Sequence, residues 1–286
     1  MHNKEMAGGF LCTDEERLLI SRATELSERS EKNAVALSFL TPREQRLVFS
    51  AMERMGCADR VFFWGGFFGA ERRRAVFLPS WLELGRCSYP LYSKEREEHF
   101  VRSLSEMGME SILSDYTGAV RLSGSGYAKL SHRDFLGALM GLGLKRSVIG
   151  DICVFDYGAV VFCEEKTSAF IAEELKNAGR DSIRSERISV DLDFSADRKF
   201  QEICTTVASL RLDGVVRALC NISRDDALQL VLQGSVELNY FVNKEPDRAV
   251  SENDIVSVRG FGKYIIDRGG EETRRGRIRL IARKYV

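Results

Sequence analysis

The chain has few of the residues that build metal sites. Its 286 residues include three histidines, at His2, His99 and His132, and seven cysteines without a single C-x-x-C pair. Structural zinc sites need closely spaced Cys and His ligands, so the sequence predicts no metal site. The cysteines are odd in number and lie mostly among apolar residues, which indicates free, buried thiols in a reducing compartment.

Long apolar runs and catalytic fingerprints are also missing. No stretch of about 18 apolar residues occurs, and the N-terminal segment lacks the apolar run of a signal peptide. We therefore expect a cytoplasmic protein that does not enter a membrane. Residues 1–200 show no cofactor fingerprint, no metal cluster and no pairing of a nucleophile with a base. We predict no catalytic residue and no small-molecule cofactor.

Net charge is absent as well, because 42 Lys and Arg balance 42 Asp and Glu. This balance hides a local excess. Residues 259–286 hold 9 basic and 3 acidic residues, whereas the preceding 258 residues hold 33 basic and 39 acidic ones. Screening limits the reach of charges to roughly 8–10 Å at physiological salt, so a phosphate-binding surface needs only local charge. The C-terminal excess favours nucleic-acid binding.

The pattern of apolar residues predicts an α+β protein of three consecutive small domains. The N-terminal unit is expected to have two helices, starting after the caps Thr13 and Thr41, and then a β-hairpin whose turn uses the glycines of residues 65–69. The middle domain is expected to be an α/β sandwich, and the C-terminal domain to join two short helices to a small sheet. The predicted boundaries are 1–85, 86–198 and 199–286.

Periodicity locates the elements of the two later domains. Helical spacing is found at 94–108, from Ser131 onward, at 168–179, at 211–220 and at 223–233. Strand-like runs are found at 111–116, 119–130, 149–165, 182–192, 236–239, 254–260, 263–267 and 277–286.

Basic residues of the C-terminal domain mark the expected binding surface. In the last strand-like run, the odd-numbered arginines would share one face if the strand is regular, although Ile281 interrupts them. The same run of arginines is also expected in a solvated edge strand, whose positive charge prevents aggregation. Arginines that begin both helices, and basic residues beside Gly260 and Gly262, favour RNA. The candidate RNA-binding residues are Arg211, Arg224, Arg259, Lys263, Arg274, Arg275, Arg277 and Arg279.

This domain has few aromatic residues that can stack on bases: Tyr240, Phe241, Phe261 and Tyr264. This scarcity favours structured RNA, read through its shape and phosphates, over an unpaired strand. If roughly five cations contact phosphates at once, log affinity should fall with log salt at a slope on the order of −4.

Residues 211–263 resemble the alpha-L RNA-binding motif, which is shared by ribosomal small-subunit protein four, some pseudouridine synthases and a heat-shock ribosome-binding protein. Two positions depart from the motif: Asn239-Tyr240 replaces its Asn-Gly, and Asn253-Asp254 replaces its Gly-Asp. The matching elements are RLD (211–213), SRDDA (223–227), QGSVELN (233–239), Pro246 and DIVSVRGFGKY (254–264).

Two upstream runs, FWGGFFGAERRR (63–74) and LSHRDFLGALMGLGLKRSVIGDI (130–152), are similar to signatures of the bacterial YlmH family. This resemblance implies an RNA-binding middle domain and a C-terminal alpha-L motif. It also implies a non-catalytic protein that binds rRNA and tRNA on the large ribosomal subunit, in the quality control of stalled peptidyl-tRNA, with a link to cell division. The alternative is an RNA-modifying enzyme, a pseudouridine synthase or methyltransferase, that uses the alpha-L motif for targeting.

Overall fold

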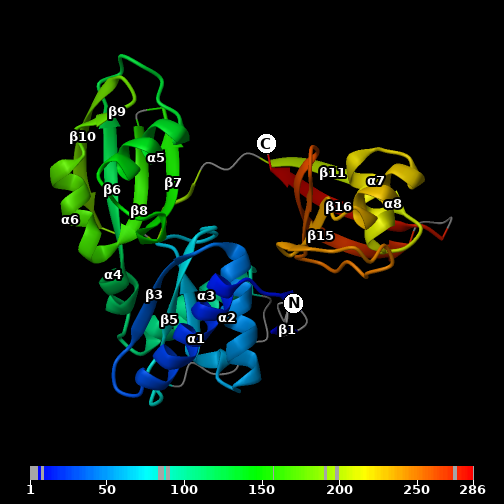
Figure 1. Ribbon diagram of the computed structural model, residues 1–286, viewed down its shortest axis with the longest axis horizontal. Coiled ribbons are helices and arrows are strands. Elements are labelled where there is room, and N and C mark those ends of the chain that lie inside the picture. Colours follow the sequence, from blue (N-terminus) through cyan, green and yellow to red (C-terminus); the bar gives the residue numbers. More distant parts are fainter. Residues whose placement is uncertain are drawn as a thin grey trace. The chain divides into compact units, whose positions relative to one another are not determined.

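The computed structural model describes residues 6–7, 10–82, 87, 91–156, 158–189, 192–196, 200–272 and 276–285. The chain forms two compact units, Met1–Asp197 and Arg198–Val286. Both contain helices and antiparallel sheets (Figure 1), so the predicted α+β class is confirmed. None of the helices in these ranges is long and apolar enough to cross a membrane.

The first unit begins with two helices that start at threonine caps. In α1 (Asp14–Arg29) and α2 (Pro42–Arg54), the cap side chain accepts a hydrogen bond from the backbone amide of the glutamate three residues on. The carboxylate of that glutamate accepts one from the cap amide in return. These boxes satisfy amides that a helix start leaves without partners. The predicted starts after Thr13 and Thr41 are therefore confirmed.

A three-stranded sheet packs with these helices in the order β3 (Val35–Leu40), β5 (Arg73–Phe77), β4 (Val61–Trp64). The pairing of β4 with β5 confirms the predicted hairpin. β3 was not predicted, because its run VALSFL is mostly apolar and lacks the alternation of a half-buried strand. The remaining elements of this half are β1 (Met6–Ala7), β2 (Phe10–Leu11), η1 (Ala58–Arg60) and α3 (Lys94–Glu106).

The segment 111–116 was predicted to be a strand and is instead helix α4 (Ser111–Tyr116). The amides of Ile112 and Leu113 donate to the carbonyl groups of Met109 and Glu110, at 3.1 and 2.9 Å. Both side chains are buried in the same apolar cluster. The prediction was wrong because two adjacent apolar residues in a run of six fit neither the helical nor the strand period.

The second sheet of the first unit has five strands in the order β7, β8, β6, β10, β9. One face packs against two helices through Phe135, Leu139 and Ile171, and the other face packs Val160 and Phe162 against the loop that joins β4 to β5. Burial on both faces makes this half the predicted α/β sandwich. The elements are β6 (Thr117–Gly124), α5 (His132–Gly141), η2 (Arg146–Val148), β7 (Ile149–Phe155), β8 (Gly158–Glu164), α6 (Glu165–Glu174), β9 (Asn177–Ala178) and β10 (Asp181–Ile188).

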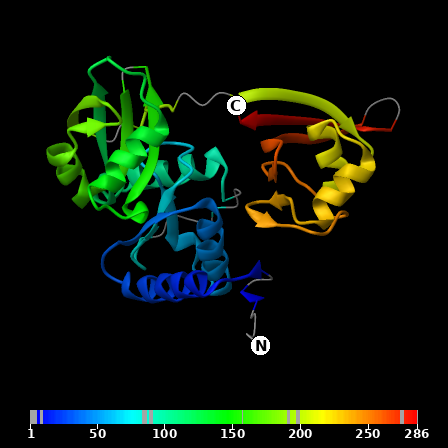
Figure 2. The same ribbon diagram turned by 45° about the horizontal axis from the view of Figure 1, so that its top comes forward.

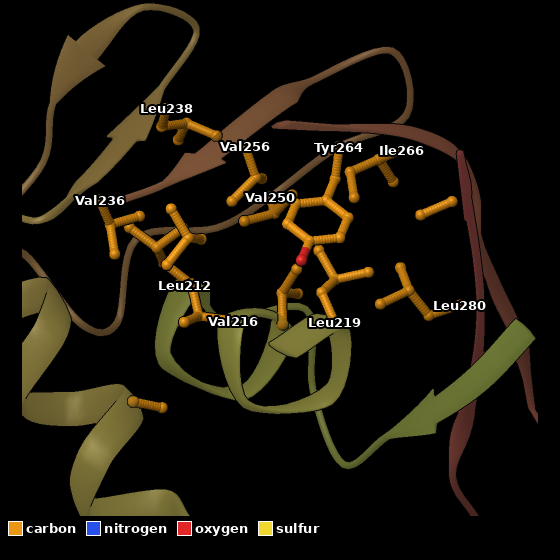
Figure 3. Packing of buried hydrophobic residues seen from close by; sticks show 14 of the residues in the cluster. Leu212, Val216, Leu219, Val236, Leu238, Val250, Val256, Tyr264, Ile266 and Leu280 are labelled. Atoms are coloured by element: carbon orange, nitrogen blue, oxygen red, sulfur yellow. The ribbon is translucent and has the colours of Figure 1, made fainter. Parts of the chain in front are cut away.

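The second unit is a six-stranded antiparallel sheet with two helices on one face (Figures 1 and 2). Its core lies between the layers, where Leu212, Val216 and Leu219 of the first helix face Val256, Tyr264 and Leu280 of the sheet (Figure 3). In sheet order the strands are β11 (Phe200–Val207), β16 (Ile278–Tyr285), β15 (Gly262–Glu272), β14 (Ile255–Val258), β12 (Val236–Leu238) and β13 (Phe241–Val242); the helices are α7 (Leu212–Cys220) and α8 (Arg224–Leu232).

Strand β11 was missed by the sequence analysis, although it pairs with β16 over its whole length, from Phe200↔Tyr285 to Val207↔Ile278. Its sequence, FQEICTTV, has apolar residues that do not alternate with polar ones, and it carries no turn signal before it. Its strand character comes from this pairing, which joins residues about 80 positions apart in the sequence. The predicted helices and later strands of this unit are confirmed.

Candidate nucleic-acid interface

Strand β16 presents different residues to the two faces of the sheet. Leu280 and Ala282 are fully buried in the core beneath α7 and α8. The pairing with β11 is regular along the strand, so the alternate residues Arg279, Ile281 and Arg283 point to the opposite side. The structure therefore puts two arginines of the run on one face, interrupted by an isoleucine.

We call this opposite side the open sheet face. Its residues are half-buried or exposed, whereas the residues that form the core on the other face, Val207, Tyr264, Ile266, Leu280 and Ala282, are buried. It is made by the outward residues of three neighbouring strands, β11, β16 and β15: Phe200, Glu202, Cys204, Thr206, Arg279, Ile281, Arg283, Tyr285, Lys263, Ile265 and Asp267.

Three aromatic rings and two cations gather at one end of the open sheet face; we call them the ring array: Tyr240, Lys263, Tyr285, Phe200 and Arg283. The Lys263 Nζ lies 4.4 Å from the ring centroid of Tyr285 and 5.4 Å from that of Tyr240. The rings of Tyr285 and Phe200 meet edge to face at 5.0 Å. The Arg283 Cζ lies 5.1 Å from the centroid of Phe200. Each cation thus lies over the electron-rich face of a ring.

Arg283 is also held by Asp267, whose carboxylate accepts hydrogen bonds from its Nε and Nη2 atoms at 2.9 and 2.6 Å. This hydrogen bonding raises the pKa of Arg283. The bidentate contact fixes the plane of the guanidinium and neutralises its charge locally. Arg283 therefore supports the neighbouring ring of Phe200 and is less suited to a phosphate.

Tyr240 occupies a strained position in the turn between β12 and β13. Asn239 and Tyr240 have φ values of +51° and +68°, the left-handed backbone that a type I′ turn requires at both central residues. Asn239 suits it, and its side chain binds Asp254 at 2.7 Å. A bulky residue at such a φ costs roughly 1–3 kcal/mol. The turn forms without the usual Asn-Gly, and Asn253, with φ +66°, likewise stands in for a glycine.

Arg211 lies at the start of α7 and forms two parallel hydrogen bonds with Asp213. Their lengths are 3.1 Å from Nε to Oδ1 and 3.2 Å from Nη2 to Oδ2. The hydrogen bonds and charge of Asp213 raise the pKa of Arg211. The arginine side chain is 48% exposed, so part of its guanidinium remains accessible to a phosphate.

Arg224 and Arg259 are both exposed. Arg224 is the first residue of α8, whose cap Ser223 accepts a hydrogen bond from the Asp226 amide at 3.1 Å. The amide of Arg259 donates to the carbonyl group of Ser235 at 2.9 Å, which ties the turn after β14 to the end of α8. Within the ranges that the structure describes, neither arginine side chain has an acidic partner.

The remaining candidates differ in setting. Arg277 is anchored to Thr206, with Nε 3.0 Å from the hydroxyl oxygen and Nη2 2.7 Å from the carbonyl oxygen. Arg279 is exposed on the open sheet face, next to the same threonine in the pairing. Arg274 and Arg275 lie outside the described residues.

The predicted residues therefore do not share one surface. Arg211 and Arg224 belong to the helix layer, whereas Lys263 and Arg279 lie on the other side of the sheet. Sequence periodicity cannot reveal this division, because it does not tell which face of the sheet the helices cover.

The residues that could stack on bases differ from the predicted ones. Phe241 and Tyr264 are buried and unavailable to a base. Phe200 and Tyr285 were not among the predicted stacking residues. Both belong to the ring array, together with Tyr240. The signal that would have found them is the pairing of β11 with β16, since it makes the first residue of one strand the neighbour of the last residue of the other.

An exposed tyrosine, Tyr127, lies in the first unit, in the loop between β6 and α5. The buried carboxylate of Asp181 accepts hydrogen bonds from the amide and hydroxyl groups of Ser125. The Ser125 hydroxyl in turn accepts one from the Tyr127 amide at 3.3 Å. The loop is thereby held, with Tyr127 86% exposed and with Lys129 and Arg133 exposed nearby in sequence.

No group of three or more His, Cys, Asp or Glu side chains that could hold a metal ion is found among the residues described. The exposed groups that the structure brings together on the open sheet face are cations and aromatic rings.

Comparisons with known proteins show what the chain is similar to. A family model described as "Putative RNA-binding domain in YlmH" matches residues 123–191. The chain is 30% identical over 271 residues to the Ribosome-associated protein quality control protein P2 of Bacillus subtilis (strain 168), a match that covers 93% of this chain and 94% of that protein. Among solved structures, Cell division protein ylmH from Streptococcus pneumoniae is similar, with 17% identity, a TM-score of 0.41, and coverage of 62% of this chain and 93% of that one.

Proposed function

Because the chain belongs to the YlmH family, we propose that it is a ribosome-associated RNA-binding protein of the cytoplasm that acts in the quality control of stalled peptidyl-tRNA. The observation that carries this proposal is the near full-length similarity to the Bacillus subtilis quality-control protein. We propose further that it binds rRNA and tRNA on the large subunit and catalyses no reaction. We also propose a link to cell division.

The alpha-L motif is the proposed RNA-binding element of residues 199–286, and the three-domain division is kept as part of the proposal. The alpha-L assignment is supported by the order of the elements. Two short helices, each beginning beside an arginine, precede the strands on which Lys263 and Arg279 lie. Arginine binds phosphate through several donors in a fixed plane, and the start of a helix adds amide groups that attract anions. Arg224, at the start of α8, combines these two features. At the start of α7, Arg211 supplies the guanidinium alone, because the first three amides of that helix already donate to Arg248, Pro246 and Asp213.

The proposal is tested by mixing the full-length protein with purified ribosomal subunits and mapping crosslinked nucleotides. We expect cosedimentation with the large subunit, crosslinks to its rRNA and to tRNA, and a log–log salt slope on the order of −4. Recovery of the small subunit alone, of no rRNA, or a nearly flat salt dependence would contradict it. Formation of pseudouridine or methylated bases in rRNA by the purified protein would favour the enzyme alternative.

A further inference from the structure

We propose that the open sheet face binds an unpaired stretch of RNA, whose bases stack on Tyr240, Tyr285 and Phe200 while Lys263 and Arg279 contact its phosphates. This inference rests on the proposed RNA-binding function and adds to it a second surface with a different ligand. The helix starts would contact a folded RNA through its phosphates. The open sheet face would select bases that are not paired.

The first argument is the composition of the face. Three rings stand within about 5 Å of a cation or of one another at one end of it. Every base presents a flat π surface, so rings on a half-exposed sheet accept unpaired bases without regard to sequence. The ammonium of Lys263 now occupies the space between the rings of Tyr240 and Tyr285. On binding it can exchange this position for a phosphate, because a cation–π contact at an exposed site is weak.

The second argument is the strained backbone of Tyr240. A glycine would adopt φ +68° without strain and would close the same turn. Tyrosine there gains no buried position, since its side chain is only half-buried. What it does gain is a ring beside Lys263 on the open sheet face. Strain kept at a half-buried residue outside the core points to a ligand of that side chain.

The third argument concerns which partner fits. The face runs from Tyr285 to Arg279, a distance of about 20 Å at roughly 3.3 Å per residue, and it combines rings at one end with an exposed arginine at the other. Of the acidic residues on this face, Asp267 is neutralised by Arg283, and the exposed Glu202 accepts a hydrogen bond from the Cys204 thiol at 3.3 Å. A short unpaired RNA uses both features, bases on the rings and phosphates on the cations. A folded duplex cannot offer its base faces to the rings.

The test measures binding of the full-length protein to a fluorescein-labelled decauridylate and to a labelled RNA duplex of ten base pairs, by fluorescence anisotropy at fixed salt. We expect Tyr240→Gly and Tyr285→Leu each to weaken decauridylate binding by about 5- to 100-fold. Duplex binding and cosedimentation with the large subunit should change by less than about twofold. Tyr240→Phe, which keeps the ring, should bind as the unchanged protein does.

Tyr240→Gly also distinguishes a loss of base stacking from a loss of folding stability. It removes the strained residue from the turn, so its melting temperature should equal or exceed that of the unchanged protein. Phe170→Leu, at a 43% exposed ring of α6, is the matched control and should bind both probes normally. Unaltered decauridylate binding in Tyr240→Gly and Tyr285→Leu overturns the inference, as does an equal loss of decauridylate and duplex binding in these variants. If the unchanged protein does not cosediment with the large subunit, the proposed function is refuted instead.

Discussion

Gly66 and Phe162 meet where the two sheets of the first unit pack together: a Cβ atom on Gly66 would lie 2.1 Å from Cδ1 of Phe162. Gly66 also has φ +102°, where side chains are rarely tolerated. The ring of Phe162 is buried and packs against Phe67, with 4.7 Å between centroids. A glycine predicted to serve a hairpin turn thus also allows the second sheet to approach the first.

The substitution Gly66→Ala should destabilise the first unit by at least about 2 kcal/mol, because it adds both backbone strain and a clash with a packed ring. Both tryptophans, Trp64 and Trp81, belong to this unit, so urea unfolding followed by tryptophan fluorescence reports on it alone. Gly137→Ala is the control. Its Cβ would meet nothing within 4 Å in α5, and it should raise stability by roughly 0.5–1 kcal/mol. Equal stability of the two variants would contradict this account.

Asp151 on β7 joins the second sheet to the loop before β5. Its carboxylate accepts hydrogen bonds from the amides of Glu71 and Arg72 at 2.7 and 3.0 Å. In Asp151→Asn the side-chain amide would oppose one of these N–H groups, so unfolding free energy should fall by about 1–3 kcal/mol. Tryptophan fluorescence in urea measures it. Asp115→Asn, at an exposed carboxylate of α4, should stay within about 0.5 kcal/mol; an equal loss in both variants would sink the explanation.

Signals that lie within a few residues of each other were readable from the sequence. Thr13, Thr41 and Ser131 each begin a helix with a capping box, as the spacing of the cap and the acidic residue predicted. Features that depend on distant pairing were not readable. The array of Phe200 and Tyr285 exists only because β11 lies beside β16, and a single strand's periodicity carries no information about its neighbour.

Cys163 gives a pH dependence that can be isolated. The thiol is fully buried in β8, and this burial raises its pKa to about 12, with the charges of Glu165 and Glu164 adding to the effect. An unfolded cysteine loses its proton near a pKa of about 8.5. The folded state therefore keeps a proton that the unfolded state releases. The resulting stabilisation is complete at pH values below the pKa of the unfolded cysteine. It is lost as the pH rises towards the pKa of Cys163 in the folded protein.

Wild-type protein should consequently lose its advantage over Cys163→Ala as pH rises from 8 to 10.5, by up to about 1.4 kcal/mol per pH unit above the unfolded pKa. The comparison cancels the titration of other groups, since these are common to both proteins. Urea unfolding followed by tryptophan fluorescence at several pH values gives the difference. Cys204→Ala, at an exposed position of the second unit, should leave the profile unchanged. A difference that stays constant with pH would refute the prediction.

Arg224 offers the most direct test of phosphate binding at the helix starts. The side chain is exposed, and the cap of α8 is made by Ser223, so Arg224→Ala should leave the fold intact. Losing one phosphate contact should weaken binding to the large subunit by roughly 3- to 10-fold and lower the log–log salt slope by about 1.

Two further variants identify the cause. Arg224→Lys keeps the charge and should restore the salt slope, although it loses the bidentate geometry and hence part of the affinity. Arg22→Ala removes an exposed arginine from α1 and should change neither quantity. If Arg224→Ala and Arg22→Ala weaken binding equally, the effect comes from net charge. A loss confined to position 224 requires a phosphate at the start of α8, since net charge is the same in both variants.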